Sequence, residues 1–134
     1  MKTFRMLAAA VGLFAAGAAH AELYVIANPS TQIAPGDIRD VFLGNKQFSG
    51  GTKLVPIDNG PVQDVFLATT LKMEASRYNT IWTKKSFREG LVPPTVKSGD
   101  TDVLEFVRKT PGAIGYVASP PPTSVSIVHI IHTF

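Results

Sequence analysis

The sequence predicts an α/β fold in which a mainly parallel (mixed) sheet is flanked by helices. Short β-branched segments alternate with segments whose apolar residues recur at helical spacing, in the order β-α-β-α-α-α-β-β. Strands separated by helices are typical of sheets with parallel neighbours. The chain has no cysteine and is 45% hydrophobic, so its fold has to rest on an ordinary apolar core.

The first 21 residues have the pattern of a secretory signal peptide. Residues 1–5 carry Lys2 and Arg5, residues 6–18 are apolar, and Ala19-His20-Ala21 is a small-x-small cleavage motif. The apolar run is shorter than the roughly 20 residues that span a bilayer. We therefore expect cleavage after Ala21, export to the periplasm, no remaining membrane span, and one domain over residues 22–134.

The charge of that domain argues against nucleic acid as a partner. Without Lys2 and Arg5, eleven lysines and arginines face ten aspartates and glutamates. A nucleic-acid-binding domain normally has a clear excess of basic residues, and none is present here.

The first half of the domain predicts two strands with a short helix between them. Residues 23–27 form a buried strand that ends at Asn28-Pro29, and residues 35–43 form an amphipathic helix with Gly44 as its C-terminal cap. Residues 45–51 are expected to be a loop. Residues 53–57 form the second strand, with Pro56 at a sheet edge or a strand end.

Three helices are predicted next. The first begins at or just after Pro61, and a second, capped by Ser76, carries an apolar face of Tyr78, Ile81 and Trp82. The inward stripe of the first helix is expected to be Val62, Val65, Phe66, Thr69 and Met73. Residues 90–99 contain Pro93-Pro94 and are predicted to be only a loop. Asp100 or Asp102 caps the third helix, with Glu105 available for a capping box and an end at Thr110.

Two strands complete the chain. The turn Pro111-Gly112 leads into a strand over residues 113–118, and residues 125–134 form the last strand after a proline-rich turn. Gly115 would weaken the first of these strands unless another group approaches it closely. We expect a packing reason for this glycine.

No catalytic constellation is legible, and we expect no enzyme, no metal site and no cofactor. His129 and His132 lie three apart in a predicted strand and so point to opposite faces. No serine-nucleophile elbow, P-loop or dinucleotide-binding glycine motif is present. The basic cluster at residues 84–88 is either a solvated helix end or an anion-facing patch.

Four segments, in order, resemble the phosphate substrate-binding proteins of ABC transporters, the PstS-like family of periplasmic binding proteins. They are "IRDVFLGNK" at residues 38–46, "KLVPID" at 53–58, Val65-Phe66 with Trp82, and "VRKTPGAIGYV" at 107–117. The family has two lobes clamped on a ligand, and the domain here has the length of one. The resemblance therefore implies a single lobe of a periplasmic binding protein.

The resemblance implies an exported module that binds phosphate or a similar oxyanion for uptake or sensing. Its partners would be an ABC transporter or another envelope protein, or a second copy of the chain as a homodimer. The candidate ligand-binding residues are Ser30, Thr31, Asn59, Gly60 and Val62, placed at strand ends.

The alternative is a non-catalytic accessory module that kept the lobe and lost the ligand site. The family turn reads roughly Asp-Gly-Ser-Gly-Thr, whereas residues 58–62 read "DNGPV". This turn has no hydroxyl group, and Pro61 has no backbone N–H to donate.

Overall fold

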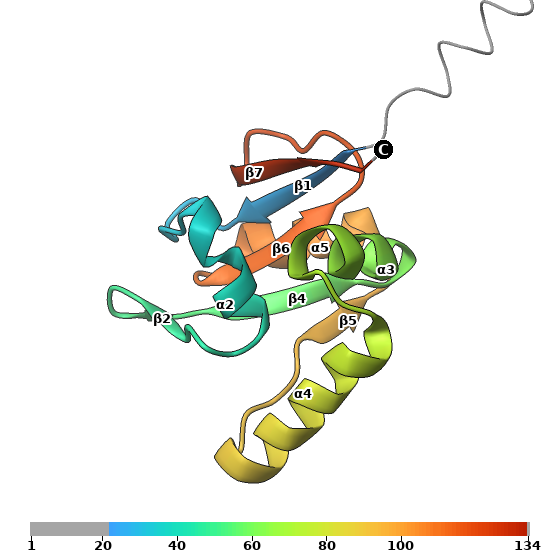
Figure 1. Ribbon diagram of the computed structural model, residues 1–134. Coiled ribbons are helices and arrows are strands. Elements are labelled where there is room, and N and C mark those ends of the chain that lie inside the picture. The colour runs from blue at the N-terminus through green and yellow to red at the C-terminus, as the bar shows by residue number, and fades with distance from the viewer. Residues whose placement is uncertain (1–21, 134) are drawn as a thin grey trace, which may run out of the picture.

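The computed structural model describes residues 22–133 as a five-stranded sheet with helices on both faces (Figure 1). The predicted signal peptide and Phe134 lie outside the described residues. The strand order is β5-β4-β6-β1-β7. These strands are β1 (Glu22–Ala27), β4 (Val55–Asn59), β5 (Thr95–Lys97), β6 (Ala113–Val117) and β7 (Ser126–His132).

The sheet is mixed, with one reversed strand. Strand β4 pairs in parallel with β5 and β6, whereas β1 pairs antiparallel with both β6 and β7. Four of the five strands therefore run in the same direction, which confirms the predicted fold class. The exception is the first strand of the chain, and its direction decides where the residues that follow it lie.

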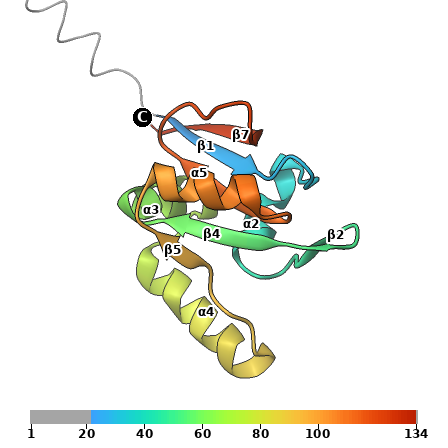
Figure 2. The same ribbon diagram turned by 180° about the vertical axis from the view of Figure 1, so that it is seen from behind.

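Helices cover the two faces unequally. One face carries α2 (Ile38–Phe42) and α3 (Gln63–Phe66), which lie in front of the sheet in Figure 1, and the other carries α5 (Asp100–Lys109), which lies in front in Figure 2. Helix α4 (Ala75–Glu89) projects from the β5 side of the sheet in both views. Short helical turns precede or extend these helices: η1 (Pro35–Asp37), η2 (Gly60–Val62) and η3 (Leu67–Leu71).

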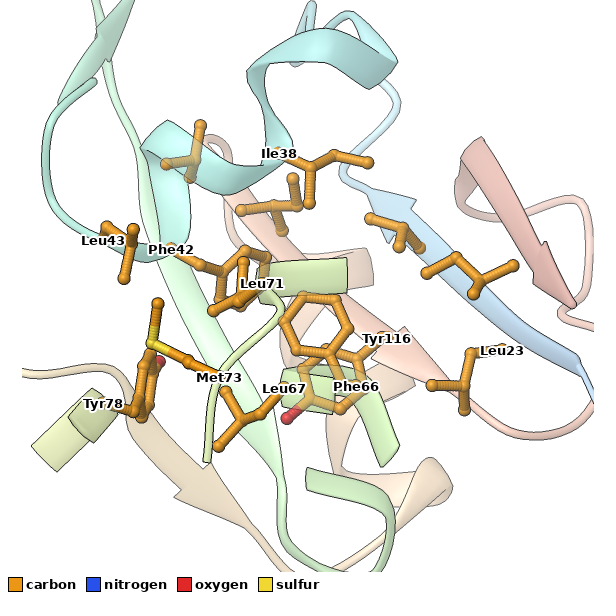
Figure 3. Close-up of a cluster of buried hydrophobic side chains, with 14 of the residues drawn as sticks. Leu23, Ile38, Phe42, Leu43, Phe66, Leu67, Leu71, Met73, Tyr78 and Tyr116 are labelled. Carbon is orange, nitrogen blue, oxygen red and sulfur yellow. The ribbon is translucent and has the colours of Figure 1, made fainter. Parts of the chain in front are cut away.

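The sheet separates two apolar clusters, as period-two alternation along a strand requires. In β6, Ile114 and Tyr116 face the larger cluster, while Ala113 and Val117 face the smaller one under α5. In the larger cluster the rings of Phe66 and Tyr116 stack with centroids 3.9 Å apart (Figure 3). The core of the fold thus lies directly against the strand that follows the Pro-Gly turn.

Gly115 has the packing reason expected for it. A Cβ at this position would lie 2.9 Å from Val103 Cγ1 and 3.1 Å from Ile57 Cγ1. Gly112 is held more tightly, because its φ is +88° and a Cβ would lie 2.1 Å from the Lys53 carbonyl oxygen. Both glycines of the "PGAIGYV" segment therefore permit close contacts within the fold.

Two strand predictions need correction. Residues 45–51 are not only a loop, because β2 (Phe48–Ser49) pairs with β3 (Thr52–Lys53) in a small hairpin. Residues 90–99 contain β5, which becomes a strand because β4 offers it a parallel partner. The strand that contains Pro56 is β4, which lies inside the sheet rather than at an edge. Pro56 is the second residue of β4, and pairing with β5 begins only at Ile57, so of the two predicted positions for this proline the strand end is confirmed.

The helix boundaries are close to the prediction, but the predicted N-terminal capping residues do not cap these helices. Helix α4 begins at Ala75 after Glu74, and α5 begins at Asp100 after Gly99, in both cases without a side-chain cap. Ser76, Asp100 and Asp102 are therefore not N-caps. Glu105 pairs with Arg108 and Lys109 rather than completing a capping box.

The inward stripe of the helix after β4 is also different from the predicted one. A π-helical segment, η3, follows α3 and rotates the buried face. Phe66 and Met73 are buried as expected, but Val65 is 39% exposed, and Leu67 and Leu71 take the inward positions. The predicted spacing failed because it assumed an uninterrupted α-helix.

Candidate functional site

The candidate site lies at the carboxyl end of β4, where the chain turns into η2 and α3. This strand end carries Asp58 and Asn59, which are 1% and 0% exposed. Open α/β sheets bind ligands at the carboxyl ends of their strands, so this edge is the place to look for one. The structure confirms that the helical segment after β4 leaves from this edge.

The Asp58 carboxylate points inward and is held by two tyrosines. Tyr78 Oη of α4 donates to Asp58 Oδ2 and Tyr116 Oη of β6 donates to Oδ1, each at 2.8 Å. Both tyrosines are buried, at 3% and 0% exposed. The sequence placed Tyr78 in the core, and this placement is confirmed, but it gave no sign of the carboxylate between the two hydroxyls.

Burial dominates the electrostatics of this group. Removal from water raises the pKa of Asp58 above its ordinary value, and the hydrogen bonds from Tyr116, Tyr78 and Gln63 act in the opposite direction. Burial, followed by the neighbouring charge of Asp58, also raises the pKa values of Tyr78 and Tyr116. Both tyrosines therefore remain hydrogen-bond donors to the carboxyl group.

A second polar network ties the same edge to α5. Asn59 Nδ2 donates to Asp100 Oδ1 at 2.9 Å and to the Tyr116 carbonyl at 3.0 Å. Asp100 also accepts hydrogen bonds from the backbone amides of Ala118 and Ser119. The carboxylates at this edge are thus occupied by donors from the protein itself. Asn59 Oδ1 is buried without a hydrogen-bond partner.

The five predicted ligand-binding residues do not come together. Strand β1 runs antiparallel to β6. Its carboxyl end therefore lies beside the start of β6, at the opposite end of the strands from the carboxyl end of β4. Ser30 there bonds to Asn28 Oδ1, and Thr31 Oγ1 accepts a 2.7 Å hydrogen bond from the Gly112 amide. Residues 113 and 117 at the two ends of β6 are about 13 Å apart at about 3.3 Å per residue.

Asn59, Gly60 and Val62 do lie together, at the carboxyl end of β4 and in η2. Pro61 stands between the last two, so the nearby backbone donors of this turn are the amides on either side of it. Lys97, which was not predicted as part of this edge, is paired with Asn59 in the register of β4 and β5. Its ammonium group lies 4.6 Å from the centroid of the Phe106 ring. Recognition of β5 as a strand would have brought this cation to attention.

A groove of about 580 Å³ opens beside the site, between α4 and β5. Asp58, Gln63 and Tyr78 line its polar part. Its walls are largely apolar and include Trp82, Phe87, Pro93, Pro94 and Val96. Its volume falls within the range of about 300–1,000 Å³ that is usual for ligand pockets.

No metal centre is formed within residues 22–133, where no three histidine, aspartate or glutamate side chains cluster. His129 and His132 are both exposed on β7, and His132 Nδ1 lies 3.1 Å from Glu22 Oε2. Across the same described range, no helix has the length and apolar character needed to cross a bilayer.

Comparison with solved structures identifies the fold. A protein from Clostridium perfringens, described as a phosphate ABC transporter substrate-binding protein with bound phosphate, matches 81% of this chain with a TM-score of 0.62 and 17% identity. PstS from Borrelia burgdorferi matches 74% with a TM-score of 0.52 and 20% identity. The fold is PstS-like. No family model and no curated protein matches the sequence.

The likeness covers only part of those proteins. This chain spans 44% of the Clostridium protein and 41% of the Borrelia PstS, less than half of each. The resemblance expected from "FLGNK" and "TPGAIGYV" is confirmed at the level of the fold, as one PstS-like lobe. The Clostridium protein is described as a substrate-binding protein.

Proposed function

We propose that this protein is an exported, non-enzymatic solute-binding module that takes phosphate or a similar oxyanion at the carboxyl end of β4, for uptake or sensing. The observation that carries the proposal is the PstS-like fold combined with a helical turn that leaves this strand end. Backbone amides at the start of a helical segment attract anions through their N–H groups and aligned dipoles.

The orientation of Asp58 removes the main objection to an anion at this edge. An aspartate at the start of the turn would repel an oxyanion if its charge faced the ligand. Here both carboxylate oxygens accept hydrogen bonds from tyrosine hydroxyl groups, and the residue is 1% exposed. The amides of Gly60 and Val62 would bind the anion, with Asn59 beside them at the end of β4.

Pro61 allows a test in which only charge is changed. This proline is exposed in η2, so Pro61→Glu and Pro61→Gln place nearly isosteric side chains at the site. Calorimetry of the purified protein with phosphate and with sulfate should show saturable binding that survives Pro61→Gln. The glutamate variant should bind at least about tenfold more weakly, because like charges meet in the site. Equal binding by the two variants would place the anion elsewhere.

The accessory-module alternative has its own supporting observation. The polar side chains at this edge are largely used internally, with Asp58 bound to two tyrosines and Asp100 bound to Asn59 and two backbone amides. No heat of binding with any oxyanion would favour that alternative. Its partner would then be an envelope protein or a second copy of the chain.

A further inference from the structure

Strand β7 is an edge strand whose outer side is unpaired. It is the last strand in the sheet order, and within residues 22–133 only β1 pairs with it; Figures 1 and 2 both show it outermost. No backbone hydrogen bond joins residues 126–131 to the connection at residues 118–125 that leads into the strand. The outer backbone groups of β7 can therefore pair with a further strand.

The connection that leads into β7 is held on the α5 side of the sheet. At its start, the Ala118 and Ser119 amides donate to the Asp100 carboxylate of α5. At its end, Val125 is 6% exposed and belongs to the apolar cluster under α5. Both anchors therefore lie on a face of the sheet and not along the outer side of β7.

The sequence of β7 lacks the residues that usually protect a sheet edge. The strand, Ser126–His132, reads "SIVHIIH" and contains no lysine, arginine, aspartate, glutamate or proline. Charged side chains and prolines are common safeguards against pairing at an edge. The opposite edge strand, β5, is only three residues long, ends in Lys97 and follows Pro93-Pro94. Pairing with another chain is therefore favoured at β7 over β5.

One irregularity interrupts the pairing of β7 with β1. His129 lies opposite Val25 and Ile127 lies opposite Ile26, so Val128 is the extra residue of a bulge. A bulge can also protect an edge, but this one is in the first half of the strand. Residues 129–132 stay in regular register with residues 22–25 and so remain a regular template for a new strand.

Two isoleucines of this edge are exposed on the same face. Ile127 is 49% exposed and Ile130 is 39% exposed. Their register partners, Ile26 and Tyr24, both pack in or against the cluster under α5, so the two isoleucines point to the α5 side. An added strand would cover apolar surface there in addition to pairing the backbone groups.

An uncharged edge with its own exposed isoleucines is matched by a second copy of itself. Antiparallel pairing about a two-fold axis at Ile130 would place this residue opposite its own copy and His129 opposite Ile131. A strongly charged partner segment would find no opposite charge in β7, so charge does not select one. The two-fold arrangement uses both β7 edges, so assembly stops at two chains.

We propose that two copies of this chain associate through their β7 strands, antiparallel and centred on Ile130, so that their two five-stranded sheets join into one. A single strand pair is smaller than the standard interface of about 1,600 Å², so we expect a dissociation constant that is about micromolar or weaker. The dimer does not depend on the oxyanion proposed above.

This arrangement has a consequence for the candidate anion site. The two-fold axis reverses the direction of the strands, so the carboxyl ends of the two β4 strands would lie at opposite ends of the joined sheet. The two η2 turns then cannot close on one ligand, and each copy would bind its own. Loss of the dimer should therefore leave oxyanion affinity per chain unchanged.

Sedimentation of the purified protein tests the association. It should show a dimer that dissociates on dilution from about 200 µM to about 1 µM. Ile130→Lys places like charges opposite each other and should raise the dissociation constant at least about tenfold. Val96→Lys is the matched control, because it replaces an apolar residue 56% exposed on the other edge strand, and it should leave the dimer unchanged. Thermal unfolding checks that both variants remain folded.

A cross-link gives a second measurement that adds no charge. The chain has no cysteine, so Ile130→Cys introduces a single thiol. Directly opposite side chains of an antiparallel pair have Cβ atoms about 4.5–5.5 Å apart, close to the separation that a disulfide spans. Under mild oxidation Ile130→Cys should link into a covalent dimer, whereas Val96→Cys should remain a single chain.

Several outcomes would overturn the proposal. These are a monomer at every concentration, a dimer that survives Ile130→Lys, and no cross-link in Ile130→Cys. A dimer lost only in Val96→Lys would assign the interface to β5 instead. Calorimetry with phosphate on Ile130→Lys separates this proposal from the oxyanion site. Absence of binding in wild type and variant alike would count against that site alone, whereas binding lost only in the variant would overturn the arrangement of the two copies.

Discussion

Replacing Tyr78 by phenylalanine removes one hydroxyl group from the centre of the fold and leaves the ring in place. The lost bond is the 2.8 Å contact from Tyr78 Oη to Asp58 Oδ2, which joins α4 to β4. Asp58 is 1% exposed, so its carboxylate depends on donors from the protein and loses one of them. Hydrogen bonds to charged groups contribute about 1.5–3 kcal/mol, and we expect a loss of about 2 kcal/mol in the free energy of unfolding at pH 7.

The loss should depend on pH in a defined direction. The folded-state pKa of Asp58 is raised above its unfolded value, so the stability linked to its protonation is present at low pH and is lost as the pH rises through the folded-state pKa. Removing a donor raises that pKa further. The destabilisation should therefore be largest near neutral pH. Well below the unfolded-state pKa of about 4, Asp58 is neutral in both states, and the loss should fall toward about 1 kcal/mol, the contribution of a neutral hydrogen bond.

Urea unfolding of the wild type and Tyr78→Phe at about pH 3.5, 5 and 7 measures this difference. The neutral-pH loss corresponds to about 8 °C in the melting temperature of a domain of this size. Repeating the series in an Asp58→Asn background is the control, because without an ionisable group the pH dependence of the Tyr78 substitution should disappear. Two results would refute the reasoning. One is a loss of stability that is the same at all three pH values, and the other is a pH dependence of that loss that remains unchanged in the Asp58→Asn background.

Two further substitutions test the packing and the two sheet edges. Gly115→Ala should cost about 1–3 kcal/mol, because its Cβ would lie 2.9 Å from Val103 Cγ1. Adding Val103→Ala should recover part of that cost in thermal unfolding, and a double variant no better than the sum of the single changes would argue against the contact. Thr31→Val should destabilise the fold by about 1–3 kcal/mol, because the buried Gly112 amide loses its 2.7 Å acceptor. It should leave oxyanion affinity unchanged in calorimetry, since Thr31 lies at the edge opposite Gly60; a loss of affinity would contradict this placement.

Local patterns were sufficient for the elements that carry their own signals. The helix over residues 35–43 appears as η1 and α2, and Gly44 adopts the left-handed conformation expected after a helix end, with φ of +77°. Strand β6 and its glycine were likewise predictable, because a short apolar run directly after a Pro-Gly turn is typical of a buried strand. Family motifs then indicated the lobe.

The remaining features depend on contacts between distant parts of the chain. Residues 95–97 form a strand only because β4 lies alongside. The preceding Pro93-Pro94 favoured a loop, so the sequence did not predict this strand. The direction of β1 moved Ser30 and Thr31 away from the candidate site, and no local residue pattern specifies that direction. The inward turn of Asp58 required two tyrosines that are 20 and 58 residues away in sequence.

The central claim is that an oxyanion binds to the amides at the carboxyl end of β4. Nuclear magnetic resonance of the ¹⁵N-labelled protein during a phosphate titration tests it most directly, because it reports each backbone N–H separately. The account predicts saturable shifts centred on the Gly60 and Val62 amides that are lost in Pro61→Glu and kept in Pro61→Gln. Shifts centred on Ser30 and Thr31, or no saturable shift at all, would contradict it.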